Sequence, residues 1–328
     1  MAEIFNVLPG VELPVREVAS RLSSMWEADS PDSPLAFRAS QMNVVLHFGL
    51  NLAPEDAREQ FFALVRFAQR YPSRIIVLCP TRTNLNNSME SKLFSQCYIG
   101  ESHREMCCCE ALLLRYEPEN CGYLFNQVST WLEGDLPTYY WFSKVPAERI
   151  EQYLDNSLLG VRRYVYDSSL EPDAVLELEW PESWRTGDLA EARLLPVRQA
   201  IGQFLNRYPI EQICEGLQVV RVSYHAETCG EGHCLLKWVR SCLDECEVSK
   251  IYDSGKFKFS IGELEPSDPC LLRLEFSYDT KKYFVFSRFK EGTCAEIKAD
   301  LGKGEEKMSV QIKSLATEQA LAESFFEH

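Results

Sequence analysis

The sequence lacks the local signatures of the common catalytic and nucleotide-binding sites. It contains no GxSxG elbow, no P-loop, no HExxH helix and no DxDxDG loop. Histidine, the most frequent general base near neutral pH, occurs only five times in 328 residues, and one of these is the last residue. These absences argue against serine hydrolases, P-loop NTPases, zinc proteases and EF-hand proteins.

The sequence also lacks a long apolar run, and its first residues do not combine a basic region with an apolar stretch. No segment reaches the roughly 18 apolar residues of a membrane-spanning helix, and no signal peptide is predicted. We therefore expect a cytoplasmic protein whose 13 cysteines are reduced thiols.

Basic residues are too few to balance the acidic ones. The chain has 34 Lys and Arg against 49 Asp and Glu, which gives a formal net charge of −15. A surface this negative repels nucleic-acid phosphates and anionic lipid headgroups. We expect neither nucleic acid nor membrane among its partners, and a protein with a basic patch fits better.

Apolar segments of strand length alternate with helical patterns in the first half of the chain. An extended entry and an amphipathic helix over residues 11–28 come first. The alternation predicts a mostly parallel sheet with helices on both faces, a Rossmann-like α/β fold. Two consecutive strands, at residues 92–99 and 104–116, make the sheet mixed. The other strands are predicted at residues 42–48, 74–80, 137–143 and 162–168, and the helices at 54–71, 121–134 and 146–158.

The alternation ends near residue 172, where we place a domain boundary. Beyond it, the sequence predicts a smaller α+β domain with an antiparallel sheet. The elements expected there are a long helix at 188–208, a strand at 217–225, a helix at 232–246, an antiparallel meander at 248–313 and a closing helix at 317–326. The predicted organisation is an N-terminal arm and helix at 1–33, a Rossmann-like domain at 34–172 and an α+β domain at 173–328.

The stretch MCCCE, residues 106–110, has three consecutive cysteines beside carboxylates. In a strand, Cys107 and Cys109 point to one face and Cys108 to the other. Three thiolates arranged in this way cannot converge on one metal ion. Because the apolar sequence ALLL follows, we interpret the triplet as small residues of a buried strand.

The stretch HAETCGEGHC, residues 225–234, has side chains that could bind zinc or react as thiols. Its spacing is not that of a zinc knuckle, because an adjacent histidine and cysteine would have to fold back on the metal. A thiol near a helix N-terminus can have a lowered pKa, and Cys229 and Cys234 flank the predicted terminus. Cys234, Trp238 and Cys242 recur at helical spacing, so we expect them to face the core. The candidate redox thiols are Cys229, Cys234, Cys242 and Cys246.

The same stretch follows a predicted strand and resembles a dinucleotide-binding fingerprint through Gly230 and Gly232. However, the third glycine position is Leu235, Glu231 would face the phosphates, and a meander is predicted in place of a parallel crossover. We favour a loop that caps a helix, and we expect no cofactor. Asp167–Ser169 end a predicted strand, where open α/β sheets bind ligands. A nucleotide or sugar phosphate there stays an alternative to a simple cap for the next element.

Several segments occur in a characteristic order along the chain, with DLP…W followed by DSS and then DLAxxRLxPxR. The segments are RASQMNVVLHF at 38–48, YPSRIIVL at 71–78, MCCCEALLLRY at 106–116, EGDLPTYYWFS at 133–143, RYVYDSS at 163–169 and GDLAEARLLPVRQAIGQFL at 187–205. Together they resemble the glucose-6-phosphate dehydrogenase assembly protein family (OpcA), over most of residues 10–290. The segment PVREVASRLSSMWEA is similar to the family's opening helix.

This resemblance implies a non-catalytic protein. Family members bind glucose-6-phosphate dehydrogenase, promote its active oligomer and raise its activity, and so control entry into the oxidative pentose phosphate pathway. In photosynthetic members this control is linked to thiol redox state. We expect the partner contacts to include Trp26, Asp135 and Trp141. Two alternatives stay open: an enzyme or sensor with a ligand near Asp167–Ser169, and a zinc or thiol redox scaffold.

Overall fold

A computed structural model describes residues 3–25, 40–85, 89–99, 106–156, 160–171, 173–180, 185–245 and 257–326. The chain forms two compact units, each made of more than one segment. Unit 1 contains Met1–Tyr166, Leu170–Gly187 and Thr317–His328, and unit 2 contains Asp167–Ser169 and Asp188–Ala316. The domain limits at residues 33 and 172 stay predictions. No helix of the described residues is both long and apolar enough to cross a membrane.

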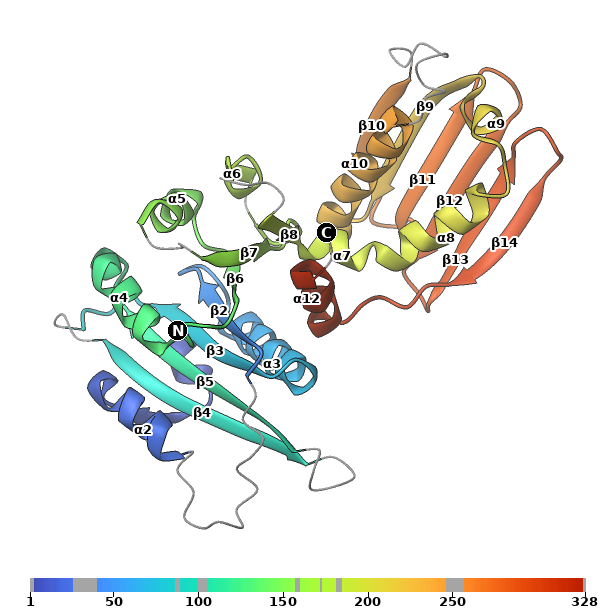
Figure 1. Cartoon of the computed structure of the whole chain (residues 1–328). Helices are drawn as coiled ribbons and strands as arrows, with labels where there is room; N and C mark the ends of the chain where they lie inside the picture. Colours follow the sequence, from blue (N-terminus) through green and yellow to red (C-terminus); the bar gives the residue numbers. More distant parts are fainter. Residues whose placement is uncertain are drawn as a thin grey trace. The chain divides into compact units, whose positions relative to one another are not determined.

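Unit 1 contains an eight-stranded sheet with the order β1-β4-β5-β3-β2-β6-β7-β8 (Figure 1). The strands are Val11–Leu13 (β1), Met42–Phe48 (β2), Ser73–Pro80 (β3), Glu90–Ile99 (β4), Met106–Tyr116 (β5), Thr138–Ser143 (β6), Val161–Tyr166 (β7) and Thr186–Asp188 (β8). The strands from β5 to β7 in this order run parallel, whereas β4 is antiparallel to β5 and β1 is antiparallel to β4. The predicted mixed Rossmann-like sheet is confirmed, and the triplet of cysteines lies in β5.

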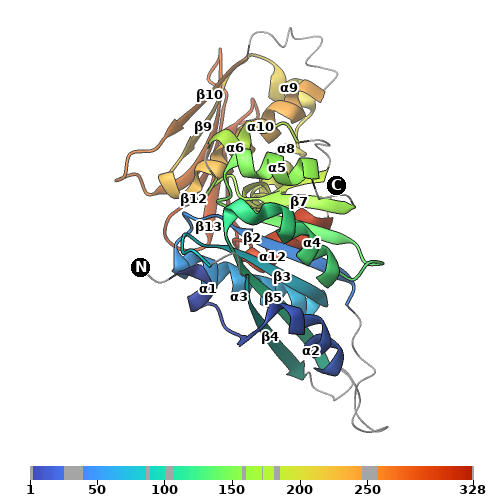
Figure 2. The same ribbon diagram turned by 90° about the vertical axis from the view of Figure 1, so that its left-hand side faces the viewer.

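Helices on both faces bury the central strands, which explains why β2 is apolar along nearly its whole length and buried throughout. α2, α4 and α5 share one hydrophobic cluster with the sheet (Figure 2). α12 packs on α3, where the Phe325 ring lies 5.5 Å from Phe67 and 4.8 Å from Tyr139. The helices of unit 1 are Ile4–Val7 (α1), Val18–Met25 (α2), Pro54–Arg70 (α3), Cys121–Trp131 (α4), Ala147–Asn156 (α5), Asp173–Leu176 (α6) and Thr317–Phe326 (α12).

A buried histidine lies inside the core of unit 1. His47 of β2 is fully buried, and its two ring nitrogens lie 2.8 Å from the Tyr140 hydroxyl and 2.6 Å from the Tyr116 hydroxyl. The Tyr116 hydroxyl lies 3.2 Å from that of Tyr153, which extends the network. Burial lowers the pKa of His47 to about 3. The imidazole is therefore neutral, so one nitrogen donates and the other accepts.

Unit 2 contains a six-stranded sheet with the order β10-β9-β11-β12-β13-β14. The strands are Leu217–Tyr224 (β9), Lys258–Glu263 (β10), Cys270–Tyr278 (β11), Tyr283–Phe289 (β12), Cys294–Asp300 (β13) and Glu306–Gln311 (β14). All neighbours are antiparallel except β9 and β10, which are parallel. The sheet is thus mainly antiparallel, as predicted, but the meander begins only at β11. The alternating pattern of β10 predicted a strand and carried no information on its direction.

The helices of unit 2 correct two predictions. They are Leu189–Arg193 (α7), Leu195–Leu205 (α8), Ile210–Cys214 (α9) and Cys229–Glu245 (α10). The single helix predicted at 188–208 is wrong. α8 restarts after Leu194 because Pro196 lies in its first turn, where it lacks an N–H and its ring would clash with a preceding helical carbonyl. α10 begins at Cys229, so Gly230 and Gly232 lie inside its first turn and not in a loop.

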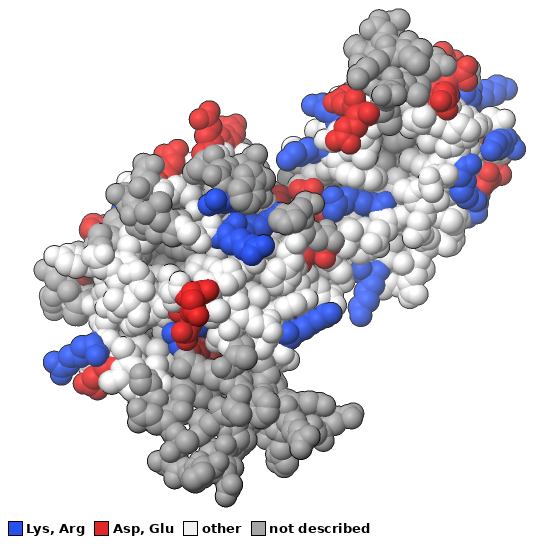
Figure 3. All heavy atoms as spheres, in the orientation of Figure 1, with Lys and Arg blue, Asp and Glu red and all other residues white. Residues whose placement is uncertain are grey.

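Charged side chains are scattered over the face seen in Figure 3, where basic groups lie singly or in small clusters among acidic ones. The described residues on this face form no long basic stripe of the kind that follows a nucleic-acid backbone.

Candidate functional site

The N-terminal arm, here α1, β1 and α2, is fixed to the sheet of unit 1 by a buried lysine. Lys92 of β4 is 6% exposed, and its Nζ donates to the carbonyl oxygen of Phe5 at 2.8 Å. The same ammonium lies 4.5 Å from the centre of the Phe5 ring, which adds a cation–π contact. Because a buried ammonium is costly unless it is satisfied, these contacts hold α1 in one place.

A second cation fixes the start of the arm. Arg115 of β5 pairs with the carboxylates of Glu3 and Glu90, the latter at 2.7 Å. Glu3 also accepts hydrogen bonds from the hydroxyls of Thr83 and Thr81, the latter at 3.1 Å. The hydrogen bond from Thr83, helped by those from Thr81 and Arg115, outweighs burial and lowers the pKa of Glu3. Glu3 is therefore a carboxylate near neutral pH.

The strand of the arm extends the sheet by one position. Val11 pairs with Leu93, and Leu13 pairs with Ser91. Gly10 makes this approach possible, because its φ is +137° and a Cβ there would lie 3.1 Å from the Cβ of Lys92. β1 is the last strand of the sheet, so its outer edge pairs with no strand of the part of the chain that the structure describes. Val11 is 75% exposed at this edge.

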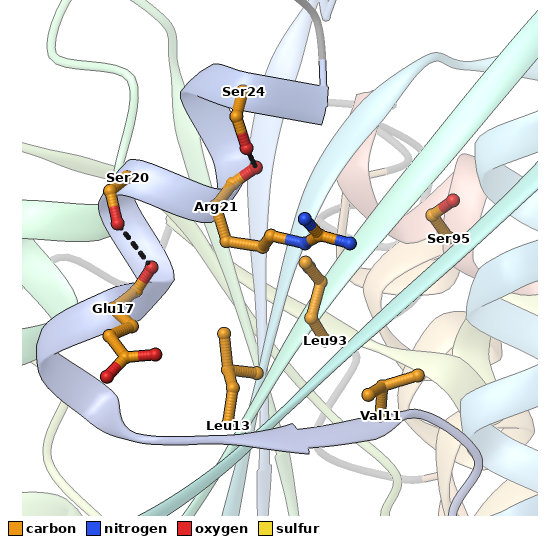
Figure 4. A pocket seen from close by; sticks show the side chains of 8 residues that line it. All are labelled: Val11, Leu13, Glu17, Ser20, Arg21, Ser24, Leu93 and Ser95. Atoms are coloured by element: carbon orange, nitrogen blue, oxygen red, sulfur yellow. Dashed lines mark hydrogen bonds between the residues drawn. The ribbon is translucent and has the colours of Figure 1, made fainter.

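A groove opens between α2, β1 and β4 (Figure 4). Its volume is about 740 Å³, and Arg21 projects across it toward Leu93. The hydroxyl of Ser20 donates to the carbonyl oxygen of Glu17 at 2.9 Å and that of Ser24 to the carbonyl oxygen of Arg21 at 3.0 Å, so both donors are used by the backbone of the arm. Arg21 makes no ion pair with a described residue. The groove is lined by Val11, Leu13, Glu17, Ser20, Arg21, Ser24, Leu93 and Ser95.

A second group of polar side chains lies in unit 2 and is called the Arg193 clamp, formed by Asp167, Ser169, Arg193 and Glu231. Arg193 binds both carboxylate oxygens of Asp167 at 2.8 Å and donates from Nε to Glu231 at 2.6 Å. Its remaining contact is to Ser169 Oγ at 2.9 Å, and that hydroxyl donates to Glu231 at 2.9 Å. Burial disfavours the charge of Arg193, but Asp167 and Glu231 outweigh it and raise the pKa of the guanidinium.

Cys234 lies beside the clamp in a setting that keeps its thiol protonated. Its Sγ donates to Asp188 Oδ2 at 3.3 Å, and the other oxygen of Asp188 accepts from the backbone N–H groups of Ser168 and Ala190 at 3.0 and 2.9 Å. Burial, reinforced by the adjacent carboxylate of Asp188, raises the pKa of the Cys234 thiol. Burial also raises the pKa of Asp188, against the hydrogen bonds that it accepts. The thiolate form needed for redox chemistry is disfavoured here.

The clamp explains Asp167–Ser169 without a ligand. Asp167 and Ser169 bind groups of unit 2 itself, and the guanidinium between them makes four hydrogen bonds of 2.9 Å or less. A phosphate could reach Arg193 only by displacing a carboxylate that already fits it in a bidentate way. The geometry therefore gives no support to a nucleotide or sugar-phosphate site at this place.

Close packing explains the glycines that resemble a dinucleotide fingerprint. A Cβ on Gly230 would lie 2.6 Å from the backbone nitrogen of Ser169, and a Cβ on Gly232 would lie 2.6 Å from the ring of Tyr224. The two glycines let α10 approach Ser169 and β9 more closely than any other residue allows. β9, α10 and β10 form a parallel crossover, as in a dinucleotide-binding unit and unlike the predicted meander. The two glycines are nevertheless required for packing and not for approach to a phosphate.

Gly230→Ala is expected to lower the free energy of unfolding by about 2 kcal/mol or more, because the backbone at Ser169 must move. Gly202→Ala in α8 is the matched control, since no atom lies within 4 Å of its Cβ position. That change should leave stability unchanged or raise it by up to about 1 kcal/mol through helix propensity. Urea denaturation of both variants measures the difference, and equal midpoints would contradict the packing role of Gly230.

The residues predicted as partner contacts lie in different surroundings. Trp26 lies outside the described residues, and Asp135 is exposed in the turn before β6. Trp141 is 1% exposed in β6, and its Nε1 has no hydrogen-bond partner among the described residues. The prediction for Trp141 is corrected, because a buried indole cannot contact a partner. Every residue of β6 is buried, so both faces of the sheet are covered at this strand.

The predicted thiols of α10 also need a correction. Cys229 is half-buried at the first position of the helix, and Cys242 is exposed and not in the core. The core stripe is one position away, at Leu235, Val239 and Leu243. Cys246 lies outside the described residues. Cys229 and Cys242 stay candidate redox thiols.

The possible metal ligands do not come together. In the part of the chain that the structure describes, no group of three or more His, Cys, Asp or Glu side chains could hold an ion. The side chain of His233 is exposed on α10. In the cysteine triplet, Cys109 is buried as predicted, and the side chains of the other two cysteines lie outside the described residues. The geometry gives no support to a zinc site.

The chain is thus an α/β protein with a Rossmann-like unit and a mainly antiparallel α+β unit. Residues 65–180 match a family model described as glucose-6-phosphate dehydrogenase subunit N-terminal domain. The resemblance stated from the sequence is confirmed over this segment, which matches the model of the OpcA glucose-6-phosphate dehydrogenase assembly family.

Solved structures with a similar arrangement share little sequence with this chain. Glucose-6-phosphate 1-dehydrogenase from Mycobacterium avium has 10% identity and a TM-score of 0.47, covering 87% of each chain. The transcriptional regulator Gal80p from Kluyveromyces lactis has 10% identity and a TM-score of 0.44, covering 93% of this chain and 85% of that one. Aldose-aldose oxidoreductase from Caulobacter crescentus has 10% identity and a TM-score of 0.40, covering 86% and 87%. These values are too low to bear on function. No curated protein matches the sequence.

Proposed function

We propose that this protein is a non-catalytic assembly factor that binds glucose-6-phosphate dehydrogenase, promotes its active oligomer and raises its activity. The observation that carries the proposal is the family match over residues 65–180. The Arg193 clamp supports it, because the polar cluster that most resembles a ligand site is occupied by its own partners. We place this activity in the cytoplasm, with no cofactor of its own.

Such an activator must bind the active state of the dehydrogenase more tightly than the inactive state, since a ligand with equal affinity for both shifts nothing. A hundredfold preference would shift the equilibrium by about 2.7 kcal/mol. The contacts that supply this preference must lie on exposed surface. The fixed N-terminal arm with its groove is one such surface, because it combines exposed apolar area with a cation, Arg21, that has no ion pair with a described residue.

The proposal predicts that the purified chain forms a complex with the dehydrogenase of the same organism and raises its rate at subsaturating substrate. The test is co-purification followed by a spectrophotometric rate assay, with and without the chain. Both are done under reducing and oxidising conditions, to find whether thiols such as Cys229 and Cys242 have a role. Absence of a complex and of any rate change in both conditions would contradict the proposed function.

A further inference from the structure

The outer edge of β1 is built as a place where another strand can be added. In an antiparallel pair, alternate backbone groups point to the partner strand and the others point away. β1 pairs with β4 on one side, and no described strand lies on the other side. Unpaired edge groups of this kind are a ready template for an incoming extended segment.

The β1 edge differs from the β14 edge of the other sheet in the side chains that it exposes. β14 carries Glu306 and Lys307, and the Lys307 ammonium pairs with Glu296. Such charges discourage edge-to-edge pairing. β1 carries one charge, Glu12, whose carboxylate lies 3.9 Å from the Lys92 ammonium, and beside it Val11, which lines the groove and is 75% exposed. An exposed apolar side chain beside free backbone groups favours a partner that offers both hydrogen bonds and apolar contact.

The arm is fixed before any partner arrives. Lys92 binds the carbonyl of Phe5, Arg115 binds Glu3, and the Ser91 hydroxyl donates to the carbonyl of Leu13 at 2.6 Å. A strand held in this way loses little conformational entropy on binding, which strengthens association.

The charges of the groove indicate the chemistry of the occupant. Two arginines of the arm differ in their pairing: Arg16 lies 3.7 Å from Glu17, whereas Arg21 has no ion pair with a described residue and crosses the groove (Figure 4). The apolar floor is formed by Val11, Leu13 and Leu93. The lining has one carboxylate, that of Glu17, which lies 3.7 Å from Arg16, and one guanidinium, that of Arg21, which has no ion pair with a described residue. Such a guanidinium beside an apolar floor fits a segment with apolar side chains and a carboxylate.

We infer that glucose-6-phosphate dehydrogenase docks an extended segment on the outer edge of β1, with apolar side chains in the groove and an acidic side chain on Arg21. This inference rests on the proposed function and identifies the surface that would bind the dehydrogenase. The proposed occupant is a strand of the dehydrogenase added to the sheet beside β1. A second copy of this chain at the same edge would instead appear as self-association without the dehydrogenase, and that outcome would overturn the inference.

Arg21→Glu is the first test, and Arg16→Glu is its matched control. Both changes reverse an exposed arginine of the arm and alter the net charge equally, but only Arg21 lines the groove. We expect Arg21→Glu to weaken binding of the dehydrogenase roughly tenfold or more, because attraction becomes repulsion at the contact. Arg16→Glu should change the affinity by less than about threefold. Circular dichroism checks that both variants are folded, and isothermal titration calorimetry gives the affinities.

Hydrogen exchange is the second test and reports on the backbone itself. On binding of the dehydrogenase, amides of Val11–Leu13 should exchange more slowly, whereas amides of Glu306–Gln311 at the β14 edge of the second sheet should not change. Equal affinities of the two charge variants, together with unchanged exchange at β1, would overturn the inference. If the wild-type chain still binds the dehydrogenase in that case, the proposed function stands. Failure of the wild-type chain to bind would overturn both.

Discussion

Replacing Arg193 by methionine is expected to lower the free energy of unfolding by about 3 kcal/mol at neutral pH. Removing one partner of a buried ion pair leaves the other charge uncompensated, and this typically costs about 3–5 kcal/mol. Here two carboxylates would lose their partner, since the side chains of Asp167 and Glu231 are each 9% exposed. We expect a cost at the lower end of this roughly 3–5 kcal/mol range because the Arg193 side chain is 21% exposed, so water can partly solvate the carboxylates left behind.

Arg198→Met is the matched control for that change. Arg198 makes a 3.3 Å ion pair with Glu191, whose side chain is 48% exposed, so its loss should cost less than about 1 kcal/mol. Both variants lose the same charge and gain the same side chain. Urea denaturation followed by circular dichroism compares their free energies of unfolding. Equal destabilisation by the two changes would show that the Arg193 clamp stabilises unit 2 no more than an exposed ion pair does.

Acidification is expected to destabilise the protein through His47. The pKa of His47 is lowered from 6.5 to about 3 by burial, so the unfolded chain binds a proton in this range that the folded chain does not. The contribution of the neutral His47 to the free energy of unfolding is therefore fully present above pH 6.5 and is lost as the pH falls toward 3. The loss from this one group is about 2 kcal/mol at pH 5 and about 4 kcal/mol near pH 3.

His47→Gln isolates this contribution, because glutamine can still donate and accept but does not titrate. The variant should be less stable than wild type at pH 7 and should lose less stability between pH 7 and pH 5. His233→Gln makes the same chemical change at an exposed position of α10 and is the control for the substitution itself. Parallel stability profiles for wild type and His47→Gln would disprove the account of the buried network.

The elements of unit 1 were predictable because its strands are buried on both faces. The segments at 42–48 and 74–80 are apolar along nearly their whole length, and this pattern indicates central parallel strands between helices. The Rossmann-like fold of unit 1 could therefore be predicted from the sequence. Unit 2 was harder, since Pro196 lies within an apolar helical pattern and β10 shows the same alternation whether it runs parallel or antiparallel.

The sites depend on contacts between distant residues, which a local pattern cannot show. Arg193 and Glu231 are 38 positions apart, and each looks like an ordinary surface charge in the sequence. Lys92 binds a carbonyl 87 positions away, and its burial inside an apolar sheet has no local signal. The groove likewise joins the arm to β4. The burial of Trp141 was missed because β6 lies between β2 and β7 and is buried at every position, and the segment itself does not show which elements cover it.

Sedimentation velocity of the dehydrogenase mixed with increasing amounts of this chain tests the central claim most directly. The proposed function predicts a saturable complex that sediments faster than either protein, with the dehydrogenase shifted toward its larger oligomer as the chain is added. Independent sedimentation of the two proteins at every ratio, under reducing and oxidising conditions alike, would contradict it.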